Sequence, residues 1–507
     1  MTAKRILAGL LVLLMLVPVF CACNPDTPDT PDVPVSDSDT TPEDTTPPED
    51  KGLVLDVTDF NGTTLRIYGL SKDYAYGYYA TDDIWIEADS SDPMEAAVYK
   101  RVQDCINKYN FNIQYTETSG TGVNDLSGLV AGGLDEADFF FLNWRFAYAA
   151  SKAGQFLDMR ECPTIDLNNE WWDQNAIRDL AIANRVFYTA GDIISRDDQN
   201  TRMLFFNKTL AENKHLASPY EMVRNNQWTF DNFAQMCRDV KEDVDGSGTL
   251  DEDDIIGFFW EEYLFNYLMV AADERYCTVS PTGEITYTWM QNSEAATKME
   301  TIAGLMVEPG VTFSVHNYTD IGAYSNKYAY GRGKFSAGKH LFTLTAADAV
   351  SEVADMEDDF GMLPLPKWSS DQTTYYHTVD IETPLGGIPN TKVDTAMIGY
   401  MLEYLSYEGR ETIRPAFYDQ MLKRRYAQDP DSQDMLDIIF STKTFDVAFV
   451  CNWSGLLNIA DSSIRSGKVP TASPFTRAAK SVGTLIEKEY NELLNVGVDT
   501  GATEATE

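Results

Sequence analysis

The chain has 507 residues, 44% of them hydrophobic and 12% aromatic, a composition typical of a globular protein with room for two or more domains. Its 79 acidic residues against 39 basic ones give a formal net charge of −40. A surface this acidic repels phosphate backbones and anionic headgroups. The charge therefore argues against nucleic acid as a partner and against charge-driven docking on a lipid surface.

The N-terminus has the pattern of a secretion signal. Lys4 and Arg5 precede an apolar run over residues 6–20, which is too short for a membrane span. The following sequence, FCAC, is similar to a bacterial lipobox, in which the acylated cysteine becomes the mature N-terminus. The resemblance implies a signal peptide over residues 1–22 and lipidation of Cys23, with Cys21 as a second acceptor. Ordinary cleavage and secretion is the alternative.

Residues 23–52 are expected to form a tether. Between residues 24 and 50 the chain has seven prolines and nine acidic residues, with Val33 and Val35 as the only aliphatic side chains. Such a segment cannot bury enough apolar surface to fold, so it should be extended and self-repelling. With a lipid anchor it would hold the chain at the outer face of the cytoplasmic membrane. A glycosylated or merely disordered segment would be extended in the same way, and residues 496–507 are expected to be a disordered tail.

From residue 53 onward, apolar runs of strand length alternate with patterns typical of helices. The continuous apolar run at 137–142 is typical of a strand buried on both faces of a parallel sheet. Further strands are predicted at 64–68, 111–115, 186–188, 203–206 and 255–260. Helices are predicted at 93–109, 146–154, 209–213, 219–225, 265–272, 293–306 and 395–407, with another after Thr229. This alternation of strand, loop and helix predicts an α/β fold.

The stretch 184–260 carries an ordered set of short motifs. Two aromatic-rich runs of strand length are followed by FFNKTLAEN, PYE, WTFDNF, an Asp-Gly loop and GFFW. This order resembles the extracellular solute-binding lipoproteins of ABC importers, in the class that binds sugars and related polar solutes. Similar steps at residues 330–342 and at FGMLPLPK, residues 360–367, extend the resemblance over most of residues 60–460.

The resemblance implies a periplasmic-binding-protein-like clamshell of type II, with two discontinuous α/β lobes joined by a hinge. One lobe is expected at residues 53–180 plus 335–385, and the other at 181–334 plus 386–495. A monomeric receptor of this kind captures a sugar or oligosaccharide between its lobes and delivers it to a membrane permease. The ATPase that drives transport is then a separate chain.

Ligands of open α/β sheets bind at the carboxyl ends of the strands, so the residues after each predicted strand are candidates for the site. Trp144 and Arg145 follow the strand at 137–142. The indole can stack on the apolar face of a pyranose, and the guanidinium can donate to hydroxyls or a carboxylate. The remaining candidates lie at other strand and loop ends: Trp172, Asp192, Trp260 and Glu261. The alternative for Trp144 and Trp172 is packing in the core. The alternative for Asp192 is a role in a turn or as a helix cap.

The acidic loop at 243–254 resembles an EF-hand calcium loop. Its oxygen-bearing residues fall at positions one, three, five, seven, nine and twelve, and Gly248 at position six allows the sharp turn. An aspartate replaces the usual glutamate at position twelve, as in dockerin-type loops. The predicted ligands of a structural Ca²⁺ are Asp243, Asp245, Ser247, Thr249, Asp251 and Asp254. The alternative is a metal-free hairpin.

Two other functional classes fit parts of this sequence. A secreted glycan hydrolase needs a pair of carboxylates, and 79 acidic residues leave such a pair possible. The sequence has no HExxH, GxSxG or CxxC motif, so we expect no enzyme and no catalytic cofactor. A calcium-dependent adhesion or scaffold protein is the other alternative, but dockerins carry their loop twice and this chain carries it once. The five cysteines after residue 52 are expected to be free thiols, with one disulfide left open.

Overall fold

The computed structural model describes residues 53–74, 79–261, 263–317, 320–392, 394–423 and 430–497. These residues belong to one compact unit that begins at Leu53. The predicted signal peptide, Cys23 and the tether lie outside the described residues, as do residues 498–507 of the predicted tail. Within the described part, no helix has the length and apolar character that a membrane crossing requires.

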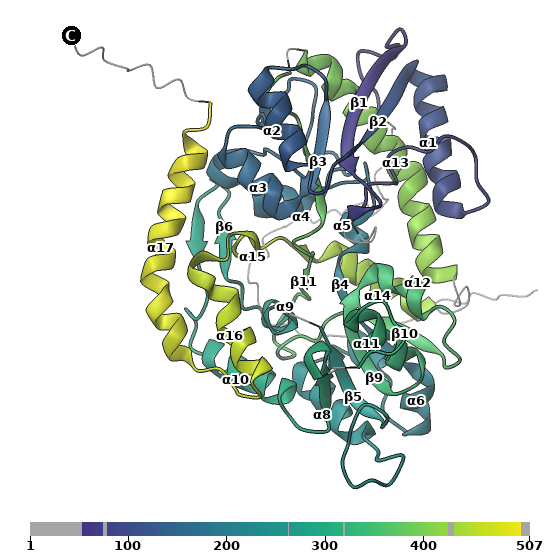
Figure 1. The fold of residues 1–507 in the computed structure, drawn as a ribbon, viewed down its shortest axis with the longest axis vertical. Coiled ribbons are helices and arrows are strands. Elements are labelled where there is room, and N and C mark those ends of the chain that lie inside the picture. Colours follow the sequence, from purple (N-terminus) through teal and green to yellow (C-terminus); the bar gives the residue numbers. More distant parts are fainter. Residues whose placement is uncertain are drawn as a thin grey trace, which may run out of the picture. The chain divides into compact units, whose positions relative to one another are not determined.

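The first sheet has four strands in the order β12-β3-β1-β2, of which Figure 1 labels β1, β2 and β3. Its strands are β1 (Thr63–Leu70), β2 (Phe111–Thr118), β3 (Phe139–Asn143) and β12 (Pro384–Gly387). β1 pairs in parallel with both β2 and β3, while β12 pairs antiparallel with β3. All five residues of β3 are buried, which confirms the strand predicted from the apolar run.

Helices pack beside this sheet, and the start of the first one is fixed by an N-cap residue. α1 (Pro93–Tyr109) begins where the Asp92 carboxylate accepts hydrogen bonds from the backbone N–H groups of Met94 and Glu95. α1 packs against α13 (Thr395–Lys423) beside the first sheet, as Figure 1 shows. The other helices before the second sheet are α2 (Val123–Gly132), α3 (Trp144–Lys152), α4 (Gln174–Leu180) and α5 (Arg196–Gln199).

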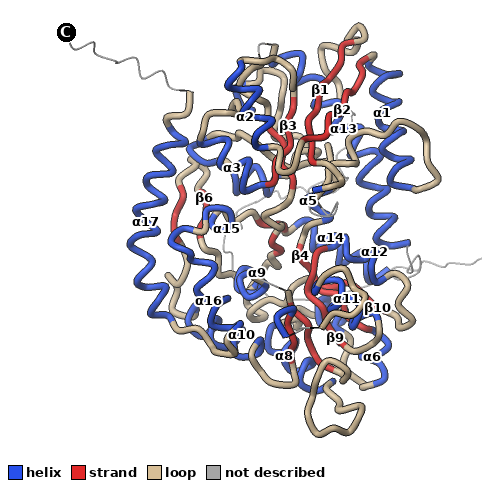
Figure 2. Tube along the Cα trace, viewed as in Figure 1, coloured by secondary structure: helices blue, strands red, loops and turns tan. Residues whose placement is uncertain are grey.

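The second sheet has five strands in the order β10-β4-β9-β5-β8. They are β4 (Arg202–Asn207), β5 (Ile256–Trp260), β8 (Thr312–Ser314), β9 (His340–Ala346) and β10 (Phe360–Leu363). Figure 2 draws these strands in red with blue helices beside them. The helices are α6 (Lys208–Asn213), α7 (Pro219–Arg224), α8 (Phe230–Val240), α9 (Leu264–Ala271), α10 (Ala295–Met306), α11 (Lys327–Ser336), α12 (Val350–Val353) and α14 (Pro430–Ser441).

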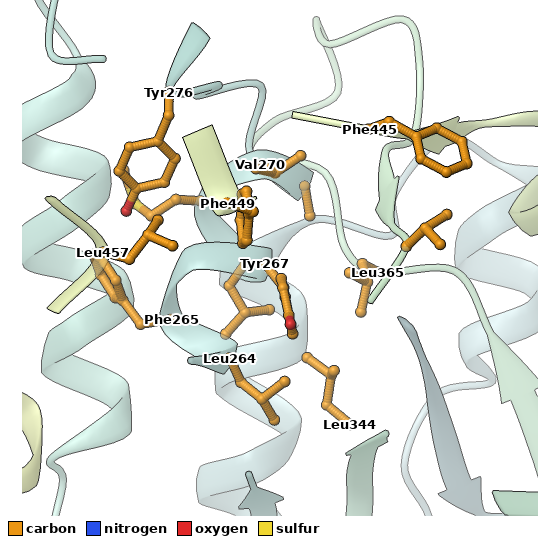
Figure 3. Packing of buried hydrophobic residues seen from close by; sticks show 14 of the residues in the cluster. Leu264, Phe265, Tyr267, Val270, Tyr276, Leu344, Leu365, Phe445, Phe449 and Leu457 are labelled. Carbon is orange, nitrogen blue, oxygen red and sulfur yellow. The ribbon is translucent and has the colours of Figure 1, made fainter. Parts of the chain in front are cut away.

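A C-terminal group of helices packs against α9 and completes the core. It consists of α15 (Ala448–Cys451), α16 (Leu456–Arg465) and α17 (Ala472–Leu494), with the hairpin of β6 (Cys277–Val279) and β7 (Ile285–Tyr287) nearby. In Figure 3 the Tyr267 ring of α9 lies beside Phe449, with ring centroids 5.5 Å apart and nearly parallel planes. Five cysteines of the described part are free thiols.

Two neighbouring segments, residues 199–202 and 378–384, pass between the two sheets, and we call them the hinge passages. The chain crosses a third time along α13, whose Leu402 packs with the first sheet and Phe417 with the second. Thr201 forms an antiparallel bridge with Val379, and the Asp380 N–H donates to the Asn200 carbonyl at 3.1 Å. β11 (His377–Thr378) precedes the second passage and pairs in parallel with β13 (Lys443–Thr444). The two passages therefore support each other through backbone hydrogen bonds.

The strand pairing corrects the predicted division into lobes. β9 and β10 belong to the second sheet, although residues 335–385 were assigned to the lobe of the first sheet. Leu402 and Leu405 of α13 pack in the core of the first sheet, although residues 386–495 were assigned to the other lobe. The chain returns to the first sheet only at the second hinge passage. Residues 186–188 form no strand, and the neighbouring Thr189 makes a single bridge to Gly386.

Candidate functional site

A hollow of about 400 Å³ lies against the two hinge passages, and we call it the central hollow. This volume falls within the range of about 300–1,000 Å³ that is usual for ligand pockets. β5 and β9 run parallel, and their carboxyl ends both reach the hollow, where ligands of such sheets bind. The lining residues are Tyr79, Asn200, Arg202, Glu261, Tyr263, Tyr267, Asn326, Tyr328, Arg332, Thr345, Ala346, Asp348, Glu352, Asp380, Ile381 and Glu382.

Two arginines with largely buried side chains organise the charges of the central hollow. Arg202, on the first hinge passage, pairs with Asp380 on the second and with Glu261 at 3.2 Å. Arg332 of α11 pairs with Glu261 at 2.9 Å and with Glu352 at 2.8 Å. Burial alone would lower the pKa of Arg202, but the Asp380 and Glu261 carboxylates raise it well above its ordinary value. The guanidinium groups therefore stay charged and hold three carboxylates in fixed positions.

Asp348 differs from the other carboxylates of the hollow because its side chain makes no hydrogen bond or ion pair with any described residue. It follows β9 and is half-buried. Burial raises its pKa to about 6, and the positive charges of Arg196, Arg332 and Arg202 oppose the rise. Its oxygens are available to a ligand, as acceptors when ionised and as a donor as well when protonated.

Tyrosines supply the apolar surface of the central hollow. Tyr79 comes from the loop after β1, while Tyr263, Tyr267 and Tyr328 come from the elements around the second sheet. The negative charge of Asp380 and burial both raise the pKa of Tyr79, so its phenol is neutral. Aromatic faces beside charged hydrogen-bonding groups match the chemistry of a sugar, which has apolar C–H faces and a rim of hydroxyls.

Two of the predicted ligand residues lie at or beside the central hollow. Glu261, directly after β5, lines it and accepts from both buried arginines. Arg145 has a side chain that is 43% exposed and pairs at 2.5 Å with Glu382, which also lines the hollow. Neither role in ligand binding is settled by position alone, so both stay predictions.

The three tryptophans predicted at the site lie in the core instead. Trp144 is fully buried, and its ring meets Phe445 edge-to-face with centroids 5.6 Å apart. Trp172 is fully buried, and its indole N–H donates to Glu403 at 2.9 Å. Trp260 is 4% exposed and does not line the hollow. None of them presents a free face for stacking, so core packing describes their positions in this conformation.

Asp192 also lies away from the central hollow. Its half-buried carboxylate is 3.7 Å from Arg414 of α13. Burial raises the pKa of Asp192 to about 7, and Arg414 opposes the rise. The residue therefore contributes to packing between the loop before α5 and α13.

Several residues of the central hollow were not predicted from the sequence. Arg202 is the first residue of an apolar strand, and Arg332 lies in a glycine-rich stretch. In both places the only local signal of a functional role is a charged residue in a segment of another character. Asp380 lies in the hinge passage with no motif around it. Tyr79 and Tyr267 are two of 27 tyrosines, and only the fold distinguishes them.

The acidic loop brings part of its predicted ligand set together. Carboxylate oxygens of Asp243, Asp245 and Asp254 all lie within 4.8 Å of one another. The Asp243 carboxylate accepts from the backbone N–H groups of Ser247 at 3.1 Å and Gly248 at 2.7 Å. Gly248 has φ +81°, the left-handed backbone that the turn at position six requires. The other predicted ligands, Thr249 and Asp251, lie in the same loop.

No protein-family model matches the sequence, and no curated protein matches it. Solved structures do match its fold. A cyclo/maltodextrin-binding protein complexed with maltotetraose is 12% identical, with a TM-score of 0.53 over 84% of this chain and 97% of that chain. These likenesses show that the chain has the two-lobed α/β fold of type II periplasmic binding proteins, as predicted.

Two further structures with this fold come from bacteria. A cyclic α-maltosyl-1,6-maltose binding protein from Arthrobacter globiformis is 11% identical, with a TM-score of 0.53 over 86% of this chain and 100% of that chain. A sugar transporter from Rhizobium etli in an open conformation is 11% identical, with a TM-score of 0.52 over 85% of this chain and 99% of that chain. All three neighbours are sugar-binding or sugar-transport proteins.

The raised pKa of Asp348 predicts a pH-dependent change in stability. Above pH 6 the folded protein carries a poorly solvated carboxylate, so Asp348→Asn should raise the free energy of unfolding by about 1–2 kcal/mol at pH 8. The gain should shrink as the pH falls from about 6 to about 4 and vanish below the unfolded pKa of 3.8, where Asp348 is protonated in both the folded and unfolded states. Denaturant unfolding from about pH 3 to pH 8 measures it. Asp355→Asn, at an exposed carboxylate nearby, is the control, and an equal gain in both variants would contradict the prediction.

Proposed function

We propose that this protein is the extracellular solute-binding lipoprotein of an ABC importer and that it captures a carbohydrate in the central hollow. The observation that carries the proposal is the composition of that hollow. Its floor is the two hinge passages, Tyr79 reaches it from the side of the first sheet, and Tyr267 and Arg332 reach it from the side of the second. The sugar ligands named for the solved neighbours support a carbohydrate over other polar solutes.

Capture follows from contacts on both sides of the hinge. A ligand that touches both lobes gains those contacts only when the lobes approach each other, so binding favours the closed arrangement. Arg202 and Asp380 stay paired through the change because they lie on adjacent hinge passages. The closed receptor then presents a binding-dependent surface to the membrane permease.

The same proposal includes the N-terminal segment and the absence of catalysis. Cys23 carries the lipid anchor, and residues 23–52 tether a monomeric receptor at the outer face of the cytoplasmic membrane. Glu261, Glu352 and Asp380 are each bound to an arginine, which suits them to hold hydroxyls and not to act as nucleophile or base. Among the described carboxylates that line the hollow, Asp348 alone has no ion pair, whereas a glycosidase requires two working carboxylates. The sugar should leave the site unchanged.

Binding and turnover of a saccharide panel test the proposal. We expect a mono- or oligosaccharide to raise the melting temperature and to bind in calorimetry without forming products. Tyr79→Ala should weaken the best ligand by about 1–3 kcal/mol, because it removes an aromatic face of the central hollow. The matched control is Tyr99→Ala, at a partly buried tyrosine of α1 outside the hollow. Hydrolysis of the bound sugar, or no binding by any saccharide, would contradict the proposal.

We also propose that the loop at 243–254 binds Ca²⁺ and stabilises the helix-to-strand connection between α8 and β5. Its three converging carboxylates support this, together with the spacing of its oxygen ligands.

Calcium at 100 times its Kd should stabilise the protein by about 2.7 kcal/mol, because the ion binds only the folded loop. Scanning calorimetry with Ca²⁺ and with a chelator measures the shift in Tm. Asp245→Asn should reduce the shift strongly, while Asp371→Asn, at an exposed loop, should preserve it. Equal Tm values with and without Ca²⁺ would leave the loop as a metal-free hairpin.

A further inference from the structure

Two further hollows lie beside the central one. A middle hollow of about 380 Å³ shares Asp348 and Glu352 with the central one. An outer hollow of about 650 Å³ shares Lys72, Asp82, Arg196, Gln199 and Gln420 with the middle one. Because neighbouring hollows share lining side chains, they adjoin one another, and we call the three together the trench. Each hollow alone has the volume of an ordinary ligand pocket.

The outer hollow contains an aromatic side chain with an exposed face. Trp85, in the loop between β1 and α1, is 38% exposed and lines this hollow. It is the only tryptophan among the exposed large hydrophobic side chains of the described residues. No other aromatic ring of the described part stacks on it, while Met94 and Val98 of α1 line the same hollow. An exposed indole beside a hollow is a suitable platform for the C–H face of a sugar ring.

The middle hollow lies between the central and outer hollows. Its polar side chains form ion pairs and hydrogen bonds with one another. Arg196 of α5 is bonded to Asp82 and donates to Gln199 at 2.7 Å, and Lys72 pairs with Asp82 at 3.2 Å. These interactions hold the donors and acceptors of the trench wall in place before a ligand arrives. Sugar hydroxyls both donate and accept hydrogen bonds, so they suit a wall of this mixed kind.

The charge of the trench restricts the class of saccharide. Two cationic side chains of the outer hollow, Lys72 and Arg196, are outnumbered by carboxylates. An anionic sugar would be repelled from such a surface, whereas a neutral sugar would not. The carboxylates of the outer hollow are Asp82, Asp83, Glu87, Asp92, Glu95 and Glu117.

We infer that the ligand is an elongated, neutral oligosaccharide that occupies the whole trench, with Trp85 stacking on a sugar ring in the outer hollow. This inference rests on the proposed function, in which the central hollow binds the first sugar units. It adds a second aromatic platform at the far end, contributed by a loop of the first sheet. A ligand that fills only the central hollow does not reach Trp85.

The test is a length series of neutral oligosaccharides with the full secreted chain. The probes are malto-, cello-, manno- and xylo-oligosaccharides of one to six units, measured by calorimetry. Affinity in the series that binds should rise with length. Trp85→Ala should weaken the longest ligand about tenfold and leave the shortest ligand unchanged, while Trp85→Phe should retain most of the affinity. Leu134→Ala, at a side chain 43% exposed outside the trench, is the matched control and should change neither.

The outcomes separate the extended trench from the proposed function. If short saccharides bind but longer ones bind no more tightly, or if Trp85→Ala has no effect on any length, the extended trench is wrong and the central site stands. If no saccharide of any length binds, the proposed function fails and the extended trench fails with it. An oligogalacturonide that binds more tightly than the neutral saccharide of the same length would overturn the charge argument.

Discussion

The ion pairs of the buried Arg202 guanidinium fix the geometry on which the rest of the site depends. Arg202 lies on one hinge passage, Asp380 on the other, and Glu261 at the end of β5. Desolvation makes such a group costly, and loss of one partner would leave an unpaired charge in the interior. The network therefore holds the floor of the central hollow in one arrangement. The walls on either side come from different sheets.

The same network divides the polar groups of the hollow into two sets. Ion pairs with arginines hold Glu261, Glu352 and Asp380 in place. Asp348 and the phenol of Tyr79 are not held in this way and are available to a ligand. Such a site can select a solute by hydrogen bonding and stacking, and Asp348 is the one carboxylate among the described lining residues that has no ion pair.

The sequence predicted the fold well because strands and helices are indicated by patterns within their own residues. The apolar runs that form β3, β4 and β5 have strand length and are bounded by turn residues. Asp92 before Pro93 indicates the start of α1. The division into lobes was less accurate, because strand order depends on pairing between distant segments. Nothing local shows that β9 pairs with β4 and β5 and not with the first sheet.

The site residues were harder to predict for a related reason. A tryptophan after a strand can face the ligand or the core, and Trp144 and Trp172 face the core. Glu261 directly follows a buried strand, and a charged side chain there is costly to place in the apolar core. Its position at the hollow could therefore be predicted. Tyr79 and Asp380 come together only through the hinge, which brings segments about 300 residues apart to one floor.

A crystal structure of the protein with a bound oligosaccharide tests the central claim most directly. We predict that the sugar lies across the hinge passages, over Arg202 and Asp380, with Tyr79 on one side and Tyr267 on the other. A saccharide bound elsewhere, with the central hollow left to solvent, would contradict this account of the site.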